Sequence, residues 1–77
     1  MSGEFKLDEL DRAIIAAIKD VREELDGHAG LVDIAGCLSR PRQMIWYRLA
    51  RLMTHGYLTS EHRKTRTIRL TEKGEQV

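Results

Sequence analysis

The first third of the chain has the hydrophobic spacing of an amphipathic helix. Its apolar positions are Leu7, Leu10, Ile14, Ala17 or Ile18, Val21 and Leu25. They follow the i, i+3, i+4, i+7 pattern that places apolar side chains on one helix face. Asp8 is a natural N-cap residue, and Asp26-Gly27 is a turn signal that ends the pattern. We therefore predict a helix over residues 7–25, preceded by a loose tail over residues 1–6.

Two shorter helical patterns follow. Four apolar residues share one face of a helix predicted over residues 31–38: Leu31, Ile34, Ala35 and Leu38. Pro41 then opens a third helix, predicted over residues 41–55, because proline fits a first helical turn where its missing N–H costs nothing. The core stripe of this third helix is Ile45, Leu49, Leu52 and Met53. Gly56 suits the left-handed residue that often follows a helix end.

The last third of the chain changes to an alternating pattern. Residues 57–60 and 65–70 are typical of two short strands, the second alternating polar and β-branched or apolar residues. The polar residues 61–64 between them form the expected tip of a hairpin spanning residues 57–70. Residues 28–30 form a connector that can add a brief strand, and residues 71–77 contain the capped start of a last helix.

Composition restricts the class of protein. The chain has 77 residues, of which 42% are hydrophobic and 32% charged, with one cysteine. This length predicts one domain over residues 1–77, of the α+β class given the predicted elements. A single cysteine forms no internal disulfide, and no apolar run approaches the roughly 18 residues of a transmembrane helix. We therefore expect a cytoplasmic protein.

Charge is divided unevenly along the chain. Residues 1–38 hold four basic and nine acidic residues, a balance of −5, whereas residues 39–77 hold nine basic and three acidic residues, a balance of +6. Such polarity indicates one face that meets a polyanion and another that stays away from it. The alternative is a chance imbalance on a solvated surface.

The elements and several motifs resemble those of a known family. The motifs are Asp33-Ile34-Ala35 with Leu38, then Ile45, Leu49, Leu52 and Gly56-Tyr57-Leu58, and finally Leu70-Thr71-Glu72-Lys73-Gly74. In this order they resemble the winged helix-turn-helix domain of MarR-type and related bacterial and archaeal transcriptional regulators, from about Leu7 to Gly74. The resemblance implies an α+β winged helix, a three-helix bundle with a two- or three-stranded β-wing, and it implies DNA binding.

Two departures from the family affect the expected assembly. Pro41 stands where the family usually has a Ser or Thr N-cap, and the family's long C-terminal dimerisation helix is missing from the pattern. We therefore expect a homodimer, if one forms, to use the helix over residues 7–25. Ile15 lies off the main stripe of that helix, where it either widens the core face or contacts the second copy.

The third helix carries the candidate DNA-reading residues. The face opposite its core stripe holds Gln43, Tyr47, Ala50, Arg51 and Thr54. Glutamine can pair with adenine and arginine with guanine at a major-groove edge, and basic residues at a helix start favour phosphate. The expected DNA-binding residues are Arg40, Arg42, Gln43, Tyr47, Arg48 and Arg51, together with Arg63, Lys64 and Arg66 on the wing.

Several of these residues have alternative structural interpretations. Arg48 lies beside the core stripe, so pairing with an acid of the first or second helix is about as expected as a phosphate contact. Trp46 is interpreted as a partly buried packing residue near Met53, and Cys37 as a buried or half-buried residue. The three histidines His28, His55 and His62 are scattered, so we expect no metal site.

Two functional classes remain. The leading hypothesis is a sequence-specific regulator of transcription that binds double-stranded DNA, with the third helix in the major groove and the wing on flanking backbone or minor groove. The alternative is a winged-helix module that binds another protein within a larger assembly. We expect no enzyme, cofactor or small-molecule substrate, because no nucleophile–base or paired-carboxylate spacing stands out and the core leaves little room for a pocket.

Overall fold

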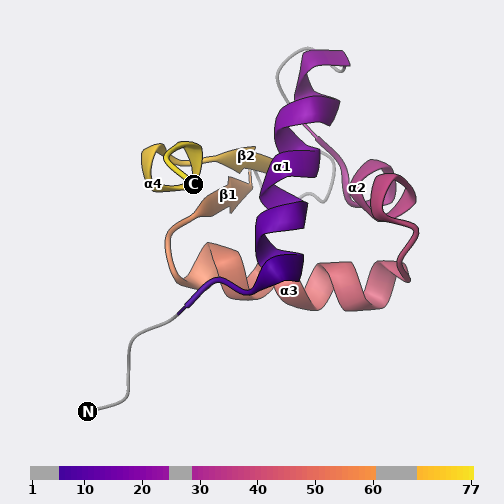
Figure 1. The fold of residues 1–77 in the computed structure, drawn as a ribbon, viewed down its shortest axis with the longest axis horizontal. Coiled ribbons are helices and arrows are strands. Elements are labelled where there is room, and N and C mark those ends of the chain that lie inside the picture. Colours follow the sequence, from indigo (N-terminus) through magenta and orange to yellow (C-terminus); the bar gives the residue numbers. More distant parts are fainter. Residues whose placement is uncertain (1–5, 25–28, 61–67) are drawn as a thin grey trace.

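The computed structural model of the chain describes residues 6–24, 29–60 and 68–77 (Figure 1). Over these ranges it is an α+β structure with four helices and one two-stranded antiparallel sheet. The elements in order are α1 (Glu9–Glu24), α2 (Leu31–Leu38), α3 (Arg42–Thr54), β1 (Leu58–Ser60), β2 (Ile68–Leu70) and α4 (Glu72–Glu75). In Figure 1, α1 stands across α3, with α2 on one side of α1 and the sheet and α4 on the other.

Helix α1 begins with a reciprocal cap. The Asp11 N–H donates to Asp8 Oδ1 over 2.9 Å, and the Asp8 N–H donates to Asp11 Oδ2 over 3.2 Å. This arrangement satisfies one N–H of the first helical turn and fixes the direction of the chain entering it. The Asp8 cap is as predicted, and the helix begins at Glu9, two residues later than the apolar pattern indicated.

The turn between α2 and α3 contains a left-handed residue that is not glycine. Helix α2 has the predicted bounds, and Ser39, which follows it, has φ 53°. The Arg40 N–H donates back to the Ala35 carbonyl over 3.1 Å, which closes the end of α2. Pro41 lies immediately before α3 and its carbonyl accepts the Ile45 N–H over 3.2 Å, so α3 begins one residue later than predicted.

Helix α3 ends as its glycine predicts. Gly56 has φ 84°, a conformation that costs residues with a Cβ considerably more. The Tyr57 N–H donates to the Leu52 carbonyl over 2.9 Å, and the Gly56 N–H donates to the Met53 carbonyl over 3.0 Å. These two bonds form a Schellman motif, which turns the chain from α3 into β1.

The two strands pair in the antiparallel sense expected of a hairpin. Leu58 faces Leu70, and Ser60 faces Ile68. Ala29 adds an antiparallel bridge to Ile68, with N–H···O distances of 3.2 and 2.9 Å, so the connector before α2 joins the edge of the sheet. Both strands lie inside the predicted ranges, while the predicted hairpin tip falls outside the described residues.

A single apolar core joins the helices to the hairpin. Its buried members are Ile14, Ile15, Ala17, Ile18, Val21, Ala29, Ile34, Ala35, Ile45, Leu49, Leu52, Leu58 and Ile68. Ile15 is 1% exposed, so of its two predicted roles the wider core face is confirmed and the contact to a second copy is wrong. The physical reason is that α1 contacts α2, α3 and β2, which widens its buried face beyond one stripe. Across the described ranges, no helix is long and apolar enough to cross a membrane.

Candidate nucleic-acid interface

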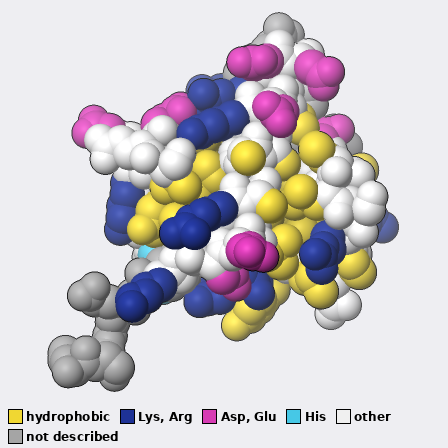
Figure 2. Space-filling view, in the orientation of Figure 1, with side chains coloured by type: hydrophobic (Ala, Val, Ile, Leu, Met, Phe, Trp, Pro, Cys, Tyr) yellow, Lys and Arg dark blue, Asp and Glu magenta, His cyan; other side chains and the backbone are white. Residues whose placement is uncertain are grey.

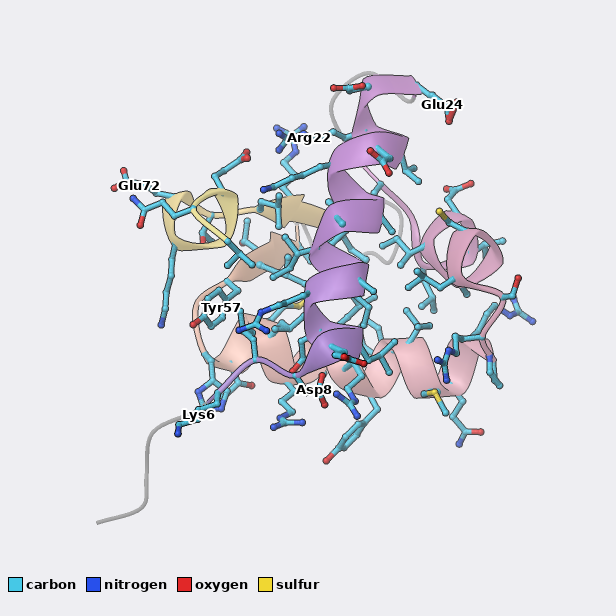
Figure 3. All side chains as sticks on the ribbon, viewed as in Figure 1. Lys6, Asp8, Arg22, Glu24, Tyr57 and Glu72 are labelled. Atoms are coloured by element: carbon cyan, nitrogen blue, oxygen red, sulfur yellow. The ribbon has the colours of Figure 1, made fainter. Side chains whose placement is uncertain are left out.

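Helix α3 lies along one edge of the molecule and presents an outward face. Its inward residues Ile45, Leu49 and Leu52 are fully buried, whereas Tyr47 is 66% exposed. In Figure 3, side chains of α3 project away from α1 into open space. The prediction that Tyr47 occupies a solvent face is confirmed. An exposed aromatic ring of this size on a basic helix is typical of a ligand-binding surface.

The surroundings of this face are basic. Residues 34–60 contain no Asp or Glu, while four arginines fall in the same stretch: Arg40, Arg42, Arg48 and Arg51. Arg40, Arg42 and Gln43 are exposed, and Arg51 is half-buried. Within the described ranges, neither Arg40 nor Arg42 forms an ion pair with a carboxylate. Their charges are therefore available at the start of α3.

The start of α3 is also electropositive in its backbone. Pro41 precedes the helix and provides no side-chain hydrogen bond to the first N–H groups. Those N–H groups point outward at the positive end of the helix dipole, which favours anions. With Arg42 in the first turn and no acid there, the helix start adds to the basic character of the face.

Arg48 has a structural partner inside the protein. Its guanidinium Nη1 lies 2.5 Å from Asp8 Oδ2 and 3.3 Å from Asp11 Oδ1. Of the two interpretations of Arg48, the structure supports the ion pair with acids at the start of the first helix. The pKa of Asp8 is lowered from 3.8 to about 2. The main cause is the hydrogen bond from Arg48, and the second is the hydrogen bond from the Asp11 backbone N–H.

This ion pair fixes α3 against α1. The Asp11 side chain is 0% exposed, and a buried carboxylate is costly unless it is hydrogen-bonded and paired. Arg48 and the Asp8 N–H supply those interactions. The three residues therefore connect the cap of α1 to the middle of α3, which holds the outward face of α3 in a fixed orientation.

The hairpin supplies one basic residue that the sequence analysis did not select. Arg69 is exposed on β2 and pairs in register with Thr59 on β1, so both side chains share one face of the sheet. Thr59 also borders a shallow slot whose wall includes Trp46 and Met53 of α3. The alternation around Ile68 in the sequence was the signal that placed Arg69 outward. The predicted wing residues Arg63, Lys64 and Arg66 lie outside the described residues.

The remaining packing predictions on α2 and α3 are wrong. Trp46 lines the same slot as Met53, but at 41% exposure it is an exposed side chain and not the partly buried packing residue that we predicted. Cys37 is exposed, so the prediction that it is buried or half-buried is wrong. The face of α2 that packs on the core holds Leu31, Ile34, Ala35 and Leu38, and Cys37 lies outside that face.

The Leu-Thr-Glu-Lys-Gly motif closes the far end of α3. The Thr71 hydroxyl donates to the Gly56 carbonyl over 2.6 Å, and Lys73 Nζ donates to the His55 carbonyl over 3.0 Å. Lys73 Nζ also lies 4.5 Å from the centre of the Tyr57 ring, which is labelled in Figure 3. A cation at a helix C-terminus offsets the negative end of the dipole. The motif thus positions α3 from its other end.

Comparisons with known proteins do not assign the chain to a family. Neither the protein-family models nor the curated proteins gave a match to the chain. Among the described residues, no three His, Cys, Asp or Glu side chains are grouped so as to hold a metal ion.

Proposed function

We propose that this chain is a winged helix-turn-helix domain that binds double-stranded DNA and regulates transcription. The order α1, α2, short turn, α3 and antiparallel hairpin, with Ala29 bridged to the sheet, supports this assignment. In the proposed complex α3 enters the major groove, which is wide enough to admit a helix. The hairpin then lies against the flanking backbone or the minor groove.

The observation that carries the proposal is the composition of the exposed face of α3. Tyr47 is the most exposed of the large hydrophobic side chains of α3, Arg42 and Gln43 are also exposed, and no acid occurs anywhere in α3. A face that met only water would gain nothing from an aromatic ring. A face that met a phosphate-lined groove would need donors, positive charge and an apolar surface for thymine methyl groups.

The residues divide into two roles in this proposal. Gln43 and Tyr47 face the bases, where a glutamine side chain can pair with adenine. Arg42 and Arg69 contact phosphate, as do the basic residues expected on the wing. Arg48 stays with Asp8 and Asp11 and keeps α3 in place, so its contribution to DNA affinity is indirect.

The test is a titration of fluorescent duplex DNA at about 50 and 200 mM salt. With about six basic contacts, affinity should fall about 10³-fold between the two concentrations. The Arg42→Ala variant should bind more weakly to all sequences and reduce the salt dependence by about one released ion. Arg12→Ala is the matched control, because Arg12 is an exposed arginine on α1 outside the proposed interface.

Two results would overturn the proposal. One is no binding at either salt concentration by protein that is folded by circular dichroism. The other is equal loss of affinity in the Arg42 and Arg12 variants, which would show that net charge and not the α3 face governs binding.

A second candidate function is a winged-helix module that binds another protein. The observation that favours it is the exposure of Met44 and Trp46, both 41%, next to Tyr47. Met, aromatic residues and Arg are enriched in protein interfaces. The same titration separates the two functions, because a protein-binding module would show no salt-dependent affinity for duplex DNA.

A further inference from the structure

A groove opens where α1 begins, between the ends of α2 and α3 that meet at the turn. It has a volume of about 760 Å³, and its apolar wall is formed by Leu10, Ala13, Leu38 and Met44. Figure 2 shows hydrophobic side chains gathered on this side of the molecule, beside acidic side chains at the foot of α1. None of these four residues belongs to the fully buried core, so the groove presents an apolar surface to the outside.

The two rims of the groove have opposite charges. Glu9 stands on the α1 side, and Arg40 stands on the side of the α2–α3 turn. Both are exposed, and neither takes part in an ion pair with another described residue. The neighbouring charges of Asp8 and Arg48 are already paired with each other.

We infer that this groove is the contact surface between two copies of the chain, related by a two-fold axis. The 41% exposed Met44 side chain of each copy enters the groove of the other and covers Leu10 and Ala13. Glu9 of each copy then meets Arg40 of the other. A two-fold interface requires a surface that is complementary to itself, and this groove has both an apolar projection and an apolar hollow.

The charges of the rims favour a second copy over a partner segment that carries charge of one sign. A basic segment in the groove would satisfy Glu9 and be repelled by Arg40, and an acidic segment would do the reverse. Rotation about a two-fold axis exchanges the rims, so each acid faces a base on both sides. The ion pairs select the orientation, while burial of the apolar wall supplies most of the stability.

Arg40 belongs both to this groove and to the basic face at the start of α3, so a dimer would use its charge in place of a DNA contact. The test of the inference contains no DNA, so its outcome is separate from that of the proposed function. Sedimentation equilibrium of the wild-type chain at about 100 μM should give twice the monomer mass of 8.9 kDa. Ala13→Arg places a long charged side chain in the hollow and should give a monomer. Ala16→Arg is the matched control, because Ala16 is exposed on the same helix and is absent from the groove wall, so this variant should remain a dimer.

A charge exchange tests the pairing itself. Glu9→Arg should weaken dimerisation at least 10-fold by placing like charges at both rims, and so should Arg40→Glu. The double variant with both changes should return to within about 3-fold of the wild-type dissociation constant. Circular dichroism checks that every variant is folded. A wild-type chain that remains at 8.9 kDa up to about 500 μM overturns the inference, as does a double variant that is weaker than either single variant.

Discussion

Gly74 is the position at which the structure gives the sharpest prediction of stability. A Cβ atom at Gly74 would lie 2.2 Å from the Tyr57 carbonyl oxygen and 3.1 Å from Leu70 Cδ2. The first distance is far below any normal contact, and its partner is backbone that cannot rotate away. Gly74→Ala must therefore push α4 away from the chain that follows α3.

The hydrogen bonds of α4 set the magnitude of this effect. Compression of a packed site costs about 1–3 kcal/mol. Release of α4 would instead break three bonds to the end of α3, in which Thr71 donates to Tyr57 and Gly56 and Lys73 donates to His55. It would also break the exposed contacts of Lys19 and Arg22 with the residues from Glu75 onward. At about 1 kcal/mol for each of the first three bonds, release costs about 3 kcal/mol or more, so compression of the site is the cheaper response. We expect about 2 kcal/mol, a fall in Tm of about 8–16 °C.

Gly36→Ala is the matched control for this experiment. Gly36 lies inside α2, and a Cβ atom there meets nothing within 4 Å. Alanine should stabilise the helix by about 0.5–1 kcal/mol, because glycine loses more backbone entropy on folding. Thermal and urea unfolding followed by circular dichroism measure both variants. Equal stabilities for the Gly74 variant and the wild type would refute the close-approach argument.

Three further predictions concern the turn and the ion pair. Ser39→Gly removes the strain of a left-handed residue with a Cβ and should raise the free energy of unfolding by about 0.5 kcal/mol, measured by urea titration. An unchanged free energy of unfolding would show that Ser39 is not strained. Arg48→Met leaves the buried Asp11 carboxylate without its cation and should cost about 2–3 kcal/mol, whereas Arg12→Met should cost less than about 0.5 kcal/mol. The lowered pKa of Asp8 stabilises the fold above about pH 4, and this contribution should be lost as the pH falls from about 4 to about 2. We expect a loss of about 1 kcal/mol in the free energy of unfolding, because the Asp8 side chain is half exposed. Asp8→Asn should remove this part of the pH dependence.

The helices were largely predictable because their signals are local. The bounds of α2 agreed with its apolar period, and Gly56 marked the end of α3 through the φ value it adopts. Helix α1 begins at Glu9, directly after the predicted Asp8 cap, whereas the predicted range started at Leu7, the first residue of the apolar pattern. Each of these features depends on residues within about one helical turn.

The sequence left alternatives open, or gave a wrong prediction, where contacts between distant elements decide the outcome. Ile15 was left between the core face and a contact to a second copy, and it is buried because α1 is covered on more than one side. Arg48 was left between two roles because its acids, Asp8 and Asp11, are about forty positions away in the chain. Cys37 is exposed because it lies outside the face of α2 that packs on the core. These outcomes depend on how elements pack, and sequence periodicity does not contain that information.

The most direct test of the DNA-binding proposal is an amide NMR titration of the ¹⁵N-labelled chain with a short duplex at low salt. We predict the largest shifts at Arg42, Gln43 and Tyr47 and at Arg69, with Arg12 on α1 unaffected. The shifts should reverse when salt is added, because phosphate contacts release counterions. Absence of shifts across α3, or shifts centred on the acidic half of α1, would contradict the proposal.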